Sequence, residues 1–312
     1  MNSASSTSGA VPRVSVVVPH YDDLHGLDLC LSALSAQSLP AEMYEIIVCD
    51  NGSRCGILAV LETVGRRGRV VIAKEKGAGP ARNVGIRAAR GEIIALTDSD
   101  CRPDRDWLAR GLASLETSDF AGGAMRVETA GANPTASEAF ELVFAFHNEV
   151  YVRRKGFSVT ANLFVPRRLF DEVGFFSNGL SEDLEWCHRA RAHGFRIGYA
   201  AEALVSHPAR RSWPELRSKW QRLTAESFAL ARRQSFGALS WLARSYLVLA
   251  ATFPDLVRTM TTPRLPDWRA RLGAAAILVR LRVFRFVEAH RLLLHHAKAP
   301  RASMPVSTTQ SG

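Results

Sequence analysis

The chain has 312 residues, of which 47% are apolar, and it carries a formal net charge of +10. This length accommodates one large α/β domain with an appendage, and no apolar stretch is long enough to predict a transmembrane helix. The five cysteines are scattered and form no Cys-x-x-Cys pair, which excludes a disulfide framework and a structural zinc site and favours a reducing, cytoplasmic location.

The two ends of the chain have the composition of segments without regular structure. Residues 1–12 are rich in serine and other small residues, and they lack the basic start and apolar segment of a signal peptide. We therefore expect a disordered leader there and a flexible tail at residues 299–312.

Strands and helices alternate after the leader. Val14–Val18 is a β-branched apolar run that predicts a buried first strand, and Leu24–Gln37 has the apolar spacing of a helix. The same patterns predict further strands at Tyr44–Cys49, Arg69–Ala73 and Ile93–Leu96, with helices at Ile57–Val64 and from Pro80 to Arg90. This alternation is typical of a mostly parallel sheet with helices on both faces.

Carboxylates follow two of these strands at their carboxyl ends. Asp98 and Asp100 come after Ile93–Leu96, and Asp50 comes after Tyr44–Cys49. Because ligands bind at this edge of an open α/β sheet, a hard divalent cation that prefers oxygen ligands would offset the repulsion between the acids. A solvated turn explains the Asp-x-Asp triplet equally well when it is taken alone, but the preceding strand favours a cation site.

A glycine-containing segment, Lys74–Asn83, leads into the third helix. Arg82 lies near the start of that helix, where free backbone N–H groups favour anions. The segment differs from a dinucleotide-binding loop because it lacks the helix-packing glycine and follows the third strand. A solvated helical arginine is the plainer interpretation, and we prefer a contact with a phosphate or a base.

The sequence after Asp100 predicts a second series of elements. Glu182 and Asp183 precede a helix at Leu184–His193, where acids commonly cap free N–H groups. The other expected helices are Arg105–Leu115, Glu138–Arg153 and a short one at Leu169–Val173. The other expected strands are Phe120–Val127, Val159–Val165, Phe195–Tyr199 and Ala203–Val205.

A series of short motifs runs from about Val14 to Pro208. The first group is Val16–Asp22, Asp50–Ser53, Gly79–Asn83 and Asp98–Asp100, and the second is Ala161–Leu163, Glu182-Asp183 and Val205–His207. In this order the two groups resemble the nucleotide-sugar half and the acceptor half of the family-2 inverting glycosyltransferases. The resemblance implies the GT-A fold of that family, a mostly parallel sheet flanked by helices, over residues 13–210.

The resemblance also implies a role for each matched residue. The nucleotide-sugar would be bound by Pro19, Tyr21, Asp50, Arg82 and Asp98, and a Mn or Mg ion by Asp100, Asp98 and His207. Asp183 would be the general base that deprotonates the acceptor hydroxyl, with Glu182 beside it. The implied reaction is a metal-dependent, inverting hexosyl transfer from a nucleoside diphosphate sugar to a hydroxyl acceptor, in cell-envelope, polysaccharide or glycolipid synthesis.

Some positions depart from the family pattern and leave alternatives open. His20 and Asp22 stand where the family usually has a smaller residue and Asn, and no Gln-x-x-Arg-Trp of processive synthases is present, which favours a single-transfer enzyme. One alternative is a non-catalytic nucleotide-sugar binding or scaffold protein, although such a protein needs no acceptor base. Another is a sugar-1-phosphate nucleotidyltransferase, which would need a basic, glycine-rich loop at His20–Leu27.

The last third of the chain is strongly basic. Pro208–Pro300 contains 17 Lys and Arg against 5 Asp and Glu, a balance of +12, while the rest of the chain is mildly acidic. Residues 211–298 therefore predict a basic helical extension, with helices at Arg217–Arg233, Leu239–Pro254 and Arg271–His296. The extension either caps the catalytic domain with a solvated basic face, which we favour, or lies on an anionic membrane as a peripheral contact on its inner face. No motif predicts nucleic-acid binding.

Overall fold

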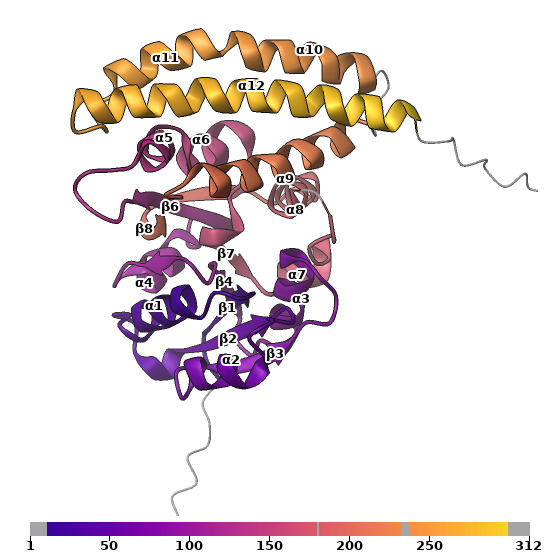
Figure 1. Ribbon diagram of the computed structural model, residues 1–312. Helices are drawn as coiled ribbons and strands as arrows, with labels where there is room; N and C mark the ends of the chain where they lie inside the picture. The colour runs from indigo at the N-terminus through magenta and orange to yellow at the C-terminus, as the bar shows by residue number, and fades with distance from the viewer. Residues whose placement is uncertain (1–10, 180, 233–236, 299–312) are drawn as a thin grey trace, which may run out of the picture. The chain divides into compact units, whose positions relative to one another are not determined.

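The computed structural model describes residues 11–179, 181–232 and 237–298 (Figure 1). The chain divides into two compact units. The sheet unit comprises Met1–Pro134 and Phe144–Ala209, and the helical unit comprises Thr135–Val143 and Arg210–Gly312. The expected tail, and the expected leader apart from residues 11 and 12, lie outside the described residues.

One sheet organises the sheet unit, with the strand order β3-β2-β1-β4-β7-β6-β8-β5 among the described residues. The first four strands along the chain run parallel, whereas β7 pairs antiparallel with both β4 and β6. The strands are β1 Val14–His20, β2 Tyr44–Asp50, β3 Arg69–Ile72, β4 Ile93–Leu96, β5 Arg102–Pro103, β6 Phe120–Glu128, β7 Leu163–Pro166 and β8 Ile197–Pro208.

Helices cover both faces of the sheet because its central strands are apolar on both sides. In β1, Val16 and Val18 belong to one buried cluster and Val17 to another. The first cluster includes residues of α1 (Leu24–Ser35), α2 (Ile57–Val64) and α4 (Trp107–Ser114). The second includes residues of α3 (Ala78–Ala88), α7 (Arg168–Val173) and α8 (Glu182–Ala192). The predicted fold class, an α/β sheet flanked by helices, is confirmed.

Helix α3 lies very close to the sheet, and a glycine makes this possible. A Cβ atom built on Gly85 would lie 2.4 Å from the sulfur of Cys49 and 2.5 Å from a methyl carbon of Val17. The absence of a side chain at Gly85, one turn after Arg82, therefore allows α3 to pack directly against the strands β1 and β2.

The end of the sheet unit differs from the sequence prediction. The two strands expected at Phe195–Tyr199 and Ala203–Val205 are a single strand, β8. Its register against β6 shifts between Gly123 and Ala124, so a bulge interrupts the apolar pattern without ending the strand.

The helix expected at Glu138–Arg153 is interrupted. Helix α5 (Ala136–Phe144) ends before Phe146, whose φ of 49° is incompatible with a helix, and α6 (Asn148–Val150) continues into a π-helix at Tyr151–Lys155. The expected strand at Val159–Val165 begins instead with a 3₁₀ turn at Thr160–Asn162, ahead of β7. A second 3₁₀ turn, Ala41–Met43, precedes β2.

Long helices make up most of the helical unit. They are α9 (Trp213–Ala231), α10 (Gly237–Ala250), α11 (Thr252–Thr261) and α12 (Trp268–Lys298). Helix α12 packs against the other three and runs alongside α10 and α11 (Figure 1). The helix expected to end at Pro254 ends earlier, and Pro254 lies in the first turn of α11, where proline is tolerated. The predicted helical extension is thus present, and among the described residues no helix has both the length and the apolar character needed to cross a membrane.

Candidate active site

The carboxyl ends of β1 and β2 lie side by side, because His20 pairs with Asp50 in the parallel register. Asp50 is buried, and its carboxylate accepts hydrogen bonds from the Ser53 hydroxyl at 2.5 Å and from the Gly52 amide at 3.2 Å. Asp50 therefore organises the turn after β2, at the edge where the resemblance implies nucleotide binding.

His20 is a residue whose structural role the motif comparison did not foresee. Its side chain is only 2% exposed, and neither ring nitrogen has a hydrogen-bond partner among the described residues. Burial lowers the pKa of His20 more than the nearby Asp50, Asp23 and Asp22 raise it. His20 is therefore a neutral, unpartnered donor and acceptor next to Asp50, and its departure from the family pattern was the sequence signal.

Tyr21 lies on the exposed loop after β1, and Lys76 approaches it. The Lys76 ammonium is 4.8 Å from the centre of the Tyr21 ring and donates to the Asn51 carbonyl at 2.6 Å. The Asn51 side chain in turn accepts from the Gly77 amide at 2.8 Å and donates to the Glu75 carbonyl at 2.7 Å. Asn51 and Lys76 thus join the turn after β2 to the loop before α3, and sequence reasoning had treated both only as loop residues.

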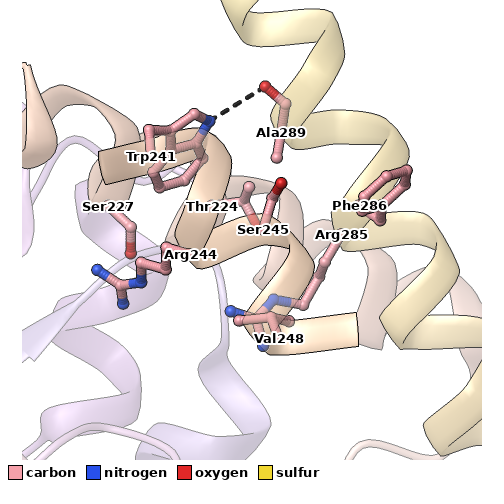
Figure 2. Close-up of a pocket in the computed structure, with 9 residues that line it drawn as sticks. All are labelled: Thr224, Ser227, Trp241, Arg244, Ser245, Val248, Arg285, Phe286 and Ala289. Carbon is pink, nitrogen blue, oxygen red and sulfur yellow. Dashed lines mark hydrogen bonds between the residues drawn. The ribbon is translucent and has the colours of Figure 1, made fainter. Parts of the chain in front are cut away.

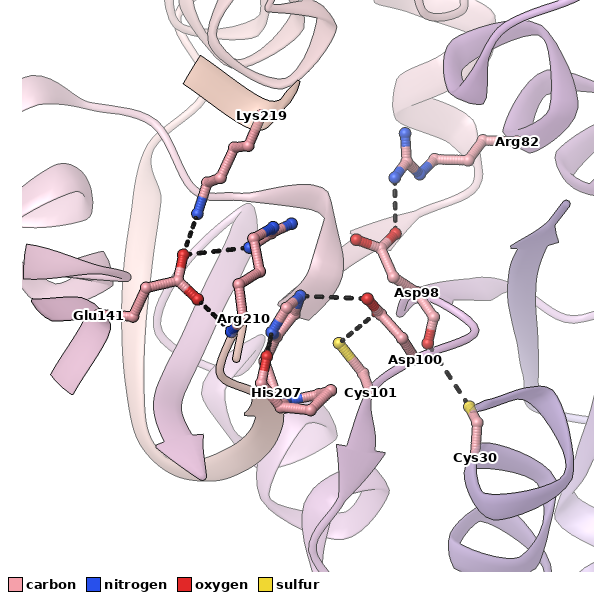
Figure 3. A network of polar contacts seen from close by, with 10 residues as sticks. Cys30, Arg82, Asp98, Asp100, Cys101, Glu141, His207, Arg210 and Lys219 are labelled. Atoms are coloured by element: carbon pink, nitrogen blue, oxygen red, sulfur yellow. Dashed lines mark hydrogen bonds and ion pairs between the residues drawn. The ribbon is translucent and has the colours of Figure 1, made fainter. Parts of the chain in front are cut away.

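Arg82 connects two acidic segments of the site, and Figure 3 shows its contact with one of them, Asp98. It is 4% exposed, and it donates from one terminal nitrogen to Asp98 at 2.6 Å and from the other to Glu182 at 2.9 Å. Burial lowers the pKa of the Arg82 guanidinium, but Asp98 and Glu182 outweigh this effect and hold it above its ordinary value. Its two terminal nitrogens are therefore engaged with two carboxylates, one 16 residues and the other 100 residues further along the chain.

The pairing of β5 with β8 brings His207 to the loop that follows β4. Arg102 is opposite Ser206 in this antiparallel pair, and the His207 Nε2 atom lies 3.3 Å from an oxygen of Asp100 (Figure 3). The His207 Nδ1 atom is 2.7 Å from the Pro208 carbonyl, which can only accept, so Nδ1 carries a proton. Nε2 is therefore directed at Asp100 and is either protonated or free to bind a cation.

Cys101 completes a small group of possible metal ligands with Asp100 and His207, whose donor atoms lie within 4.8 Å of one another. Burial raises the pKa of the Cys101 thiol well above its usual value, as do Asp98 and Asp100. A neutral thiol is a poor ligand for a hard cation, so the fitting donors are the Asp100 carboxylate and the His207 imidazole. The chemistry of this donor set fits Mn or Mg that also takes phosphate oxygens.

Asp183 lies in the first turn of α8, one residue after Glu182, and is partly buried. Ser181 occupies the capping position, and the Asp183 carboxylate accepts from the adjacent Leu184 amide at 2.7 Å. Burial raises the pKa of Asp183 to about 6, and the neighbouring Glu182 adds to the rise. Asp183 is therefore ionised at neutral pH but is a stronger base than an ordinary aspartate.

Asn162, part of the second motif group, has a scaffolding position. Its side chain accepts from the Trp107 indole at 2.9 Å and donates to the Ala124 and Ala203 carbonyls, both at 2.8 Å. Ala124 belongs to β6 and Ala203 to β8, so Asn162 fills the gap that the bulge opens between these strands.

The structure thus brings most of the predicted site residues to one region of the sheet unit. One charged group consists of Arg82 with Asp98, Glu182 and Asp183. Two residues after Asp98 on the loop that follows β4, Asp100 faces His207 of β8. Pro19, Tyr21 and Asp50 lie at the adjacent ends of β1 and β2.

Comparison with known proteins identifies the family to which the chain belongs. A match to glycosyl transferase family 2 covers residues 15–177. The chain is 32% identical over 212 residues to the glycosyltransferase AglE of Haloferax volcanii, a match that covers 65% of this chain and 69% of the relative. It is 27% identical over 220 residues to the pre-mycofactocin glycosyltransferase of Mycobacterium tuberculosis, which covers 64% of this chain and 44% of that one.

A solved structure shares the fold. The mannosyltransferase PcManGT of Pyrobaculum calidifontis, determined in complex with GDP-Man and Mn2+, aligns with a TM-score of 0.57 at 21% identity over 91% of this chain and 87% of the other. This likeness confirms the GT-A-like fold class. Together with the family match, it makes the conclusion direct: the chain belongs to glycosyl transferase family 2 and is a glycosyltransferase.

Proposed function

We propose that this glycosyltransferase transfers a hexosyl group, with inversion and with the help of a divalent cation, from a nucleoside diphosphate sugar to an acceptor hydroxyl. The observation that carries the proposal is the position of Arg82 between Asp98 and Glu182. Its two ion pairs join the acids after β4 to the first turn of α8, which contains Asp183. The residues expected to serve the donor and the acceptor therefore belong to one charged group.

The donor would bind along the ends of β1, β2 and β4. Pro19 and Tyr21 would line the pocket for the base, and Asp50 would contact the base or the ribose. Arg82 would reach the base or a phosphate, and Asp98 would contact the ribose. The two buried His20 nitrogens, which have no hydrogen-bond partner among the described residues, add two further polar groups to this edge. The solved mannosyltransferase with the same fold was determined with GDP-Man, which supports a nucleotide-sugar as the donor.

A Mn or Mg ion would be held by Asp100 and His207, with Asp98 beside them. Such an ion stabilises the negative charge that develops on the diphosphate leaving group. The Nδ1 proton of His207 is held by the Pro208 carbonyl, which leaves Nε2 oriented toward Asp100. The presence of Mn2+ in the solved mannosyltransferase supports this assignment.

Asp183 would take the proton of the acceptor hydroxyl. A hydroxyl is a poor nucleophile, and a carboxylate within hydrogen-bond distance raises its reactivity as the bond to the sugar forms. Glu182 would hold Arg82 rather than exchange protons, because its carboxylate is engaged in the 2.9 Å ion pair. Attack from the side opposite the leaving diphosphate inverts the anomeric carbon.

The helical unit supports a peripheral membrane contact of this enzyme on the cytoplasmic face, and hence a role in envelope polysaccharide or glycolipid synthesis. Helix α12 exposes six large apolar side chains whose spacing of four and seven residues puts them on one helix face: Trp268, Leu272, Val279, Val283, Val287 and Leu294. Exposed apolar side chains within a +12 segment are the combination expected of an interfacial helix.

A donor screen tests the proposed function. The purified chain is incubated with UDP-, GDP- and TDP-sugars, with Mn2+, with Mg2+ or with EDTA, and both thermal stabilisation and release of the nucleoside diphosphate are measured. We expect one donor class to stabilise the protein and to be hydrolysed slowly only when the cation is present. With an acceptor in hand, NMR of the product should show an inverted anomeric configuration. Equal hydrolysis with and without EDTA, or retention of configuration, would contradict the proposal.

A further inference from the structure

A pocket in the helical unit lies between α9, α10 and α12 (Figure 2). The space between its lining side chains, including the part that is open to solvent, amounts to about 320 Å³. The side chains of Trp241 and Phe286 form apolar walls, and those of Thr224 and Ser245 supply hydroxyl groups. Arg244 reaches the pocket from α10 and Arg285 reaches it from α12 (Figure 2). The pocket therefore combines two guanidinium groups with hydroxyls in a mostly apolar setting.

Two buried polar atoms around this pocket lack hydrogen-bond partners in the part of the chain that the structure describes. The Thr224 hydroxyl, in a side chain that is 4% exposed, and the Nε atom of Arg285 have no hydrogen-bond partner within the described part of the chain. The Trp241 indole, in contrast, donates to the Ala289 carbonyl at 3.1 Å. Since buried polar groups are nearly always hydrogen-bonded in folded proteins, the hydroxyl and the guanidinium mark a place for a ligand atom.

The positive charge in the pocket is not neutralised by the described residues. Arg285 forms no ion pair with them, and its guanidinium is stacked 4.4 Å from the centre of the Trp220 ring. The acids of this neighbourhood are already engaged, because Asp255 pairs with Arg282 and Glu288 pairs with Arg291. Burial, together with the nearby Arg282 and Arg244, lowers the pKa of Arg285 to about 10, so Arg285 remains a cation at neutral pH.

We propose that this pocket binds a phosphate group, held by the guanidinium groups of Arg285 and Arg244 and by the hydroxyl of Thr224. Guanidinium groups bind phosphate through paired, charge-assisted hydrogen bonds, and an anion here would offset two neighbouring cations. Tyr246 packs on Phe286 with ring centres 5.1 Å apart and is 55% exposed, so the pocket has an apolar rim for the moiety that carries the phosphate. The phosphate belongs either to a lipid headgroup or to a free soluble phosphate.

Three variants of the full-length protein test the proposal. Arg285→Met removes the guanidinium, and Arg269→Met is its control, because Arg269 is an exposed cation on the same helix and both variants lose one charge. Thr224→Val removes the hydroxyl without any change of charge. Binding is measured to phosphatidylcholine vesicles that contain phosphatidic acid, and to inorganic phosphate by calorimetry against chloride at equal ionic strength.

We expect Arg285→Met to weaken binding at least about tenfold, the loss expected for charge-assisted hydrogen bonds, and Thr224→Val to weaken it by a few fold. Arg269→Met should stay close to wild type. A loss confined to vesicles identifies a lipid headgroup as the source, and a loss of inorganic phosphate binding without an effect on vesicles identifies a free phosphate. Equal effects of Arg285→Met and Arg269→Met on both probes would overturn the proposal. If Arg285→Met does not fold, Arg285→Lys takes its place, since lysine keeps the charge and loses the paired donors.

Discussion

Arg82 in the sheet unit and Arg285 in the helical unit are both removed from water, yet their surroundings differ. Arg82 is 4% exposed and donates to two carboxylates, Asp98 and Glu182. Arg285 is partly buried and has Arg282 and Arg244 as its charged neighbours. A buried cation is costly unless it is paired, so the Arg82 arrangement is complete within the chain, whereas Arg285 has no ion pair among the described residues and would gain one from the proposed phosphate.

The helical unit also contains a fully paired buried charge, so the difference does not follow simply from its basic composition. Glu141 is 1% exposed and lies 2.8 Å from the Lys219 ammonium and 3.1 Å from the Arg210 guanidinium (Figure 3). Burial alone would raise the pKa of Glu141, but Lys219 and Arg210 hold it below its ordinary value. The basic composition of this unit therefore does not prevent a buried charge from being paired within the chain, and the lack of an ion pair at Arg285 among the described residues is a feature of its own surroundings.

The largest effect is expected at Asp100, the residue of the sheet unit that we propose binds the cation. Asp100→Ala removes the carboxylate that faces the His207 Nε2 atom, and we expect cation-dependent transfer to fall on the order of a thousandfold. Transfer rates with and without EDTA measure this loss, and calorimetry of UDP or GDP binding under the same two conditions measures the cation-dependent affinity. Asp106→Ala, at an exposed acid six residues along, is the control. Unchanged cation-dependent affinity in Asp100→Ala would show that the cation binds elsewhere.

The next largest effect concerns the internal pairing of Arg82. Arg82→Ala leaves Asp98, Glu182 and Asp183 without their shared cation, and we expect a loss of about 3–5 kcal/mol in the free energy of unfolding. Arg90→Ala, at an exposed arginine paired with Glu45, should change it by less than about 0.5 kcal/mol.

The loss of unfolding free energy in Arg82→Ala should depend on pH, because it arises from the pairing of charges. Arg82 lowers the pKa of Asp183, so its removal raises that pKa further in the folded state, and Asp183 takes up a proton more readily there than in the unfolded chain. The deficit of Arg82→Ala should therefore be smaller at pH 5 than at pH 8 in urea unfolding. A deficit that is independent of pH would mean that lost packing, not lost pairing, destabilises the variant.

The smallest effect is expected at the exposed apolar face of α12. Val283 is 51% exposed, and Val283→Glu should weaken flotation with anionic vesicles by a few fold without changing the melting temperature. Val11→Glu, at a 72% exposed valine of the sheet unit, supplies the same charge change in the other region of the chain. Equal binding by both variants and wild type, at low and at high salt, would favour a helical unit that packs without touching a membrane.

Much of the sheet could be predicted from local sequence, because its central strands are continuous apolar runs. The expected Ile93–Leu96 strand matches β4, and Val14–Val18 lies within β1. The single β8 strand could not be predicted, because a bulge opposite Gly123 interrupts its apolar pattern. The break after α5 depends on the left-handed backbone conformation of Phe146, and phenylalanine is not a residue type that predicts a positive φ.

For the candidate site, the motifs predicted which residues take part but not which residues they contact. Asp98, Arg82 and Glu182 were each singled out from motifs, but their ion pairs depend on how α3 and α8 pack on the sheet. The orientation of His207 Nε2 depends on a hydrogen bond between its other nitrogen and a backbone carbonyl. The Arg285 pocket has no motif at all, since three separate helices supply its walls.

The central claim, that Asp183 is the base, is tested most directly by the pH dependence of transfer in wild type and in Asp183→Asn. Because the pKa of Asp183 is raised to about 6, wild-type transfer should fall as the pH drops through 6, where the carboxylate becomes protonated. Asp183→Asn should be slower by about a hundredfold or more, should lack this pH dependence, and should still bind donor.

The melting temperature of Asp183→Asn and a matched control variant show whether a loss of activity comes from the base or from the fold. A carboxyl group whose pKa is raised on folding destabilises the protein once it ionises, so Asp183→Asn should be at least as stable as wild type at pH 8. Asp171→Asn, at an exposed acid of α7, should transfer at the wild-type rate. Loss of activity in Asp183→Asn with unchanged donor binding and melting temperature is the predicted result, and transfer by this variant near the wild-type rate would contradict the account.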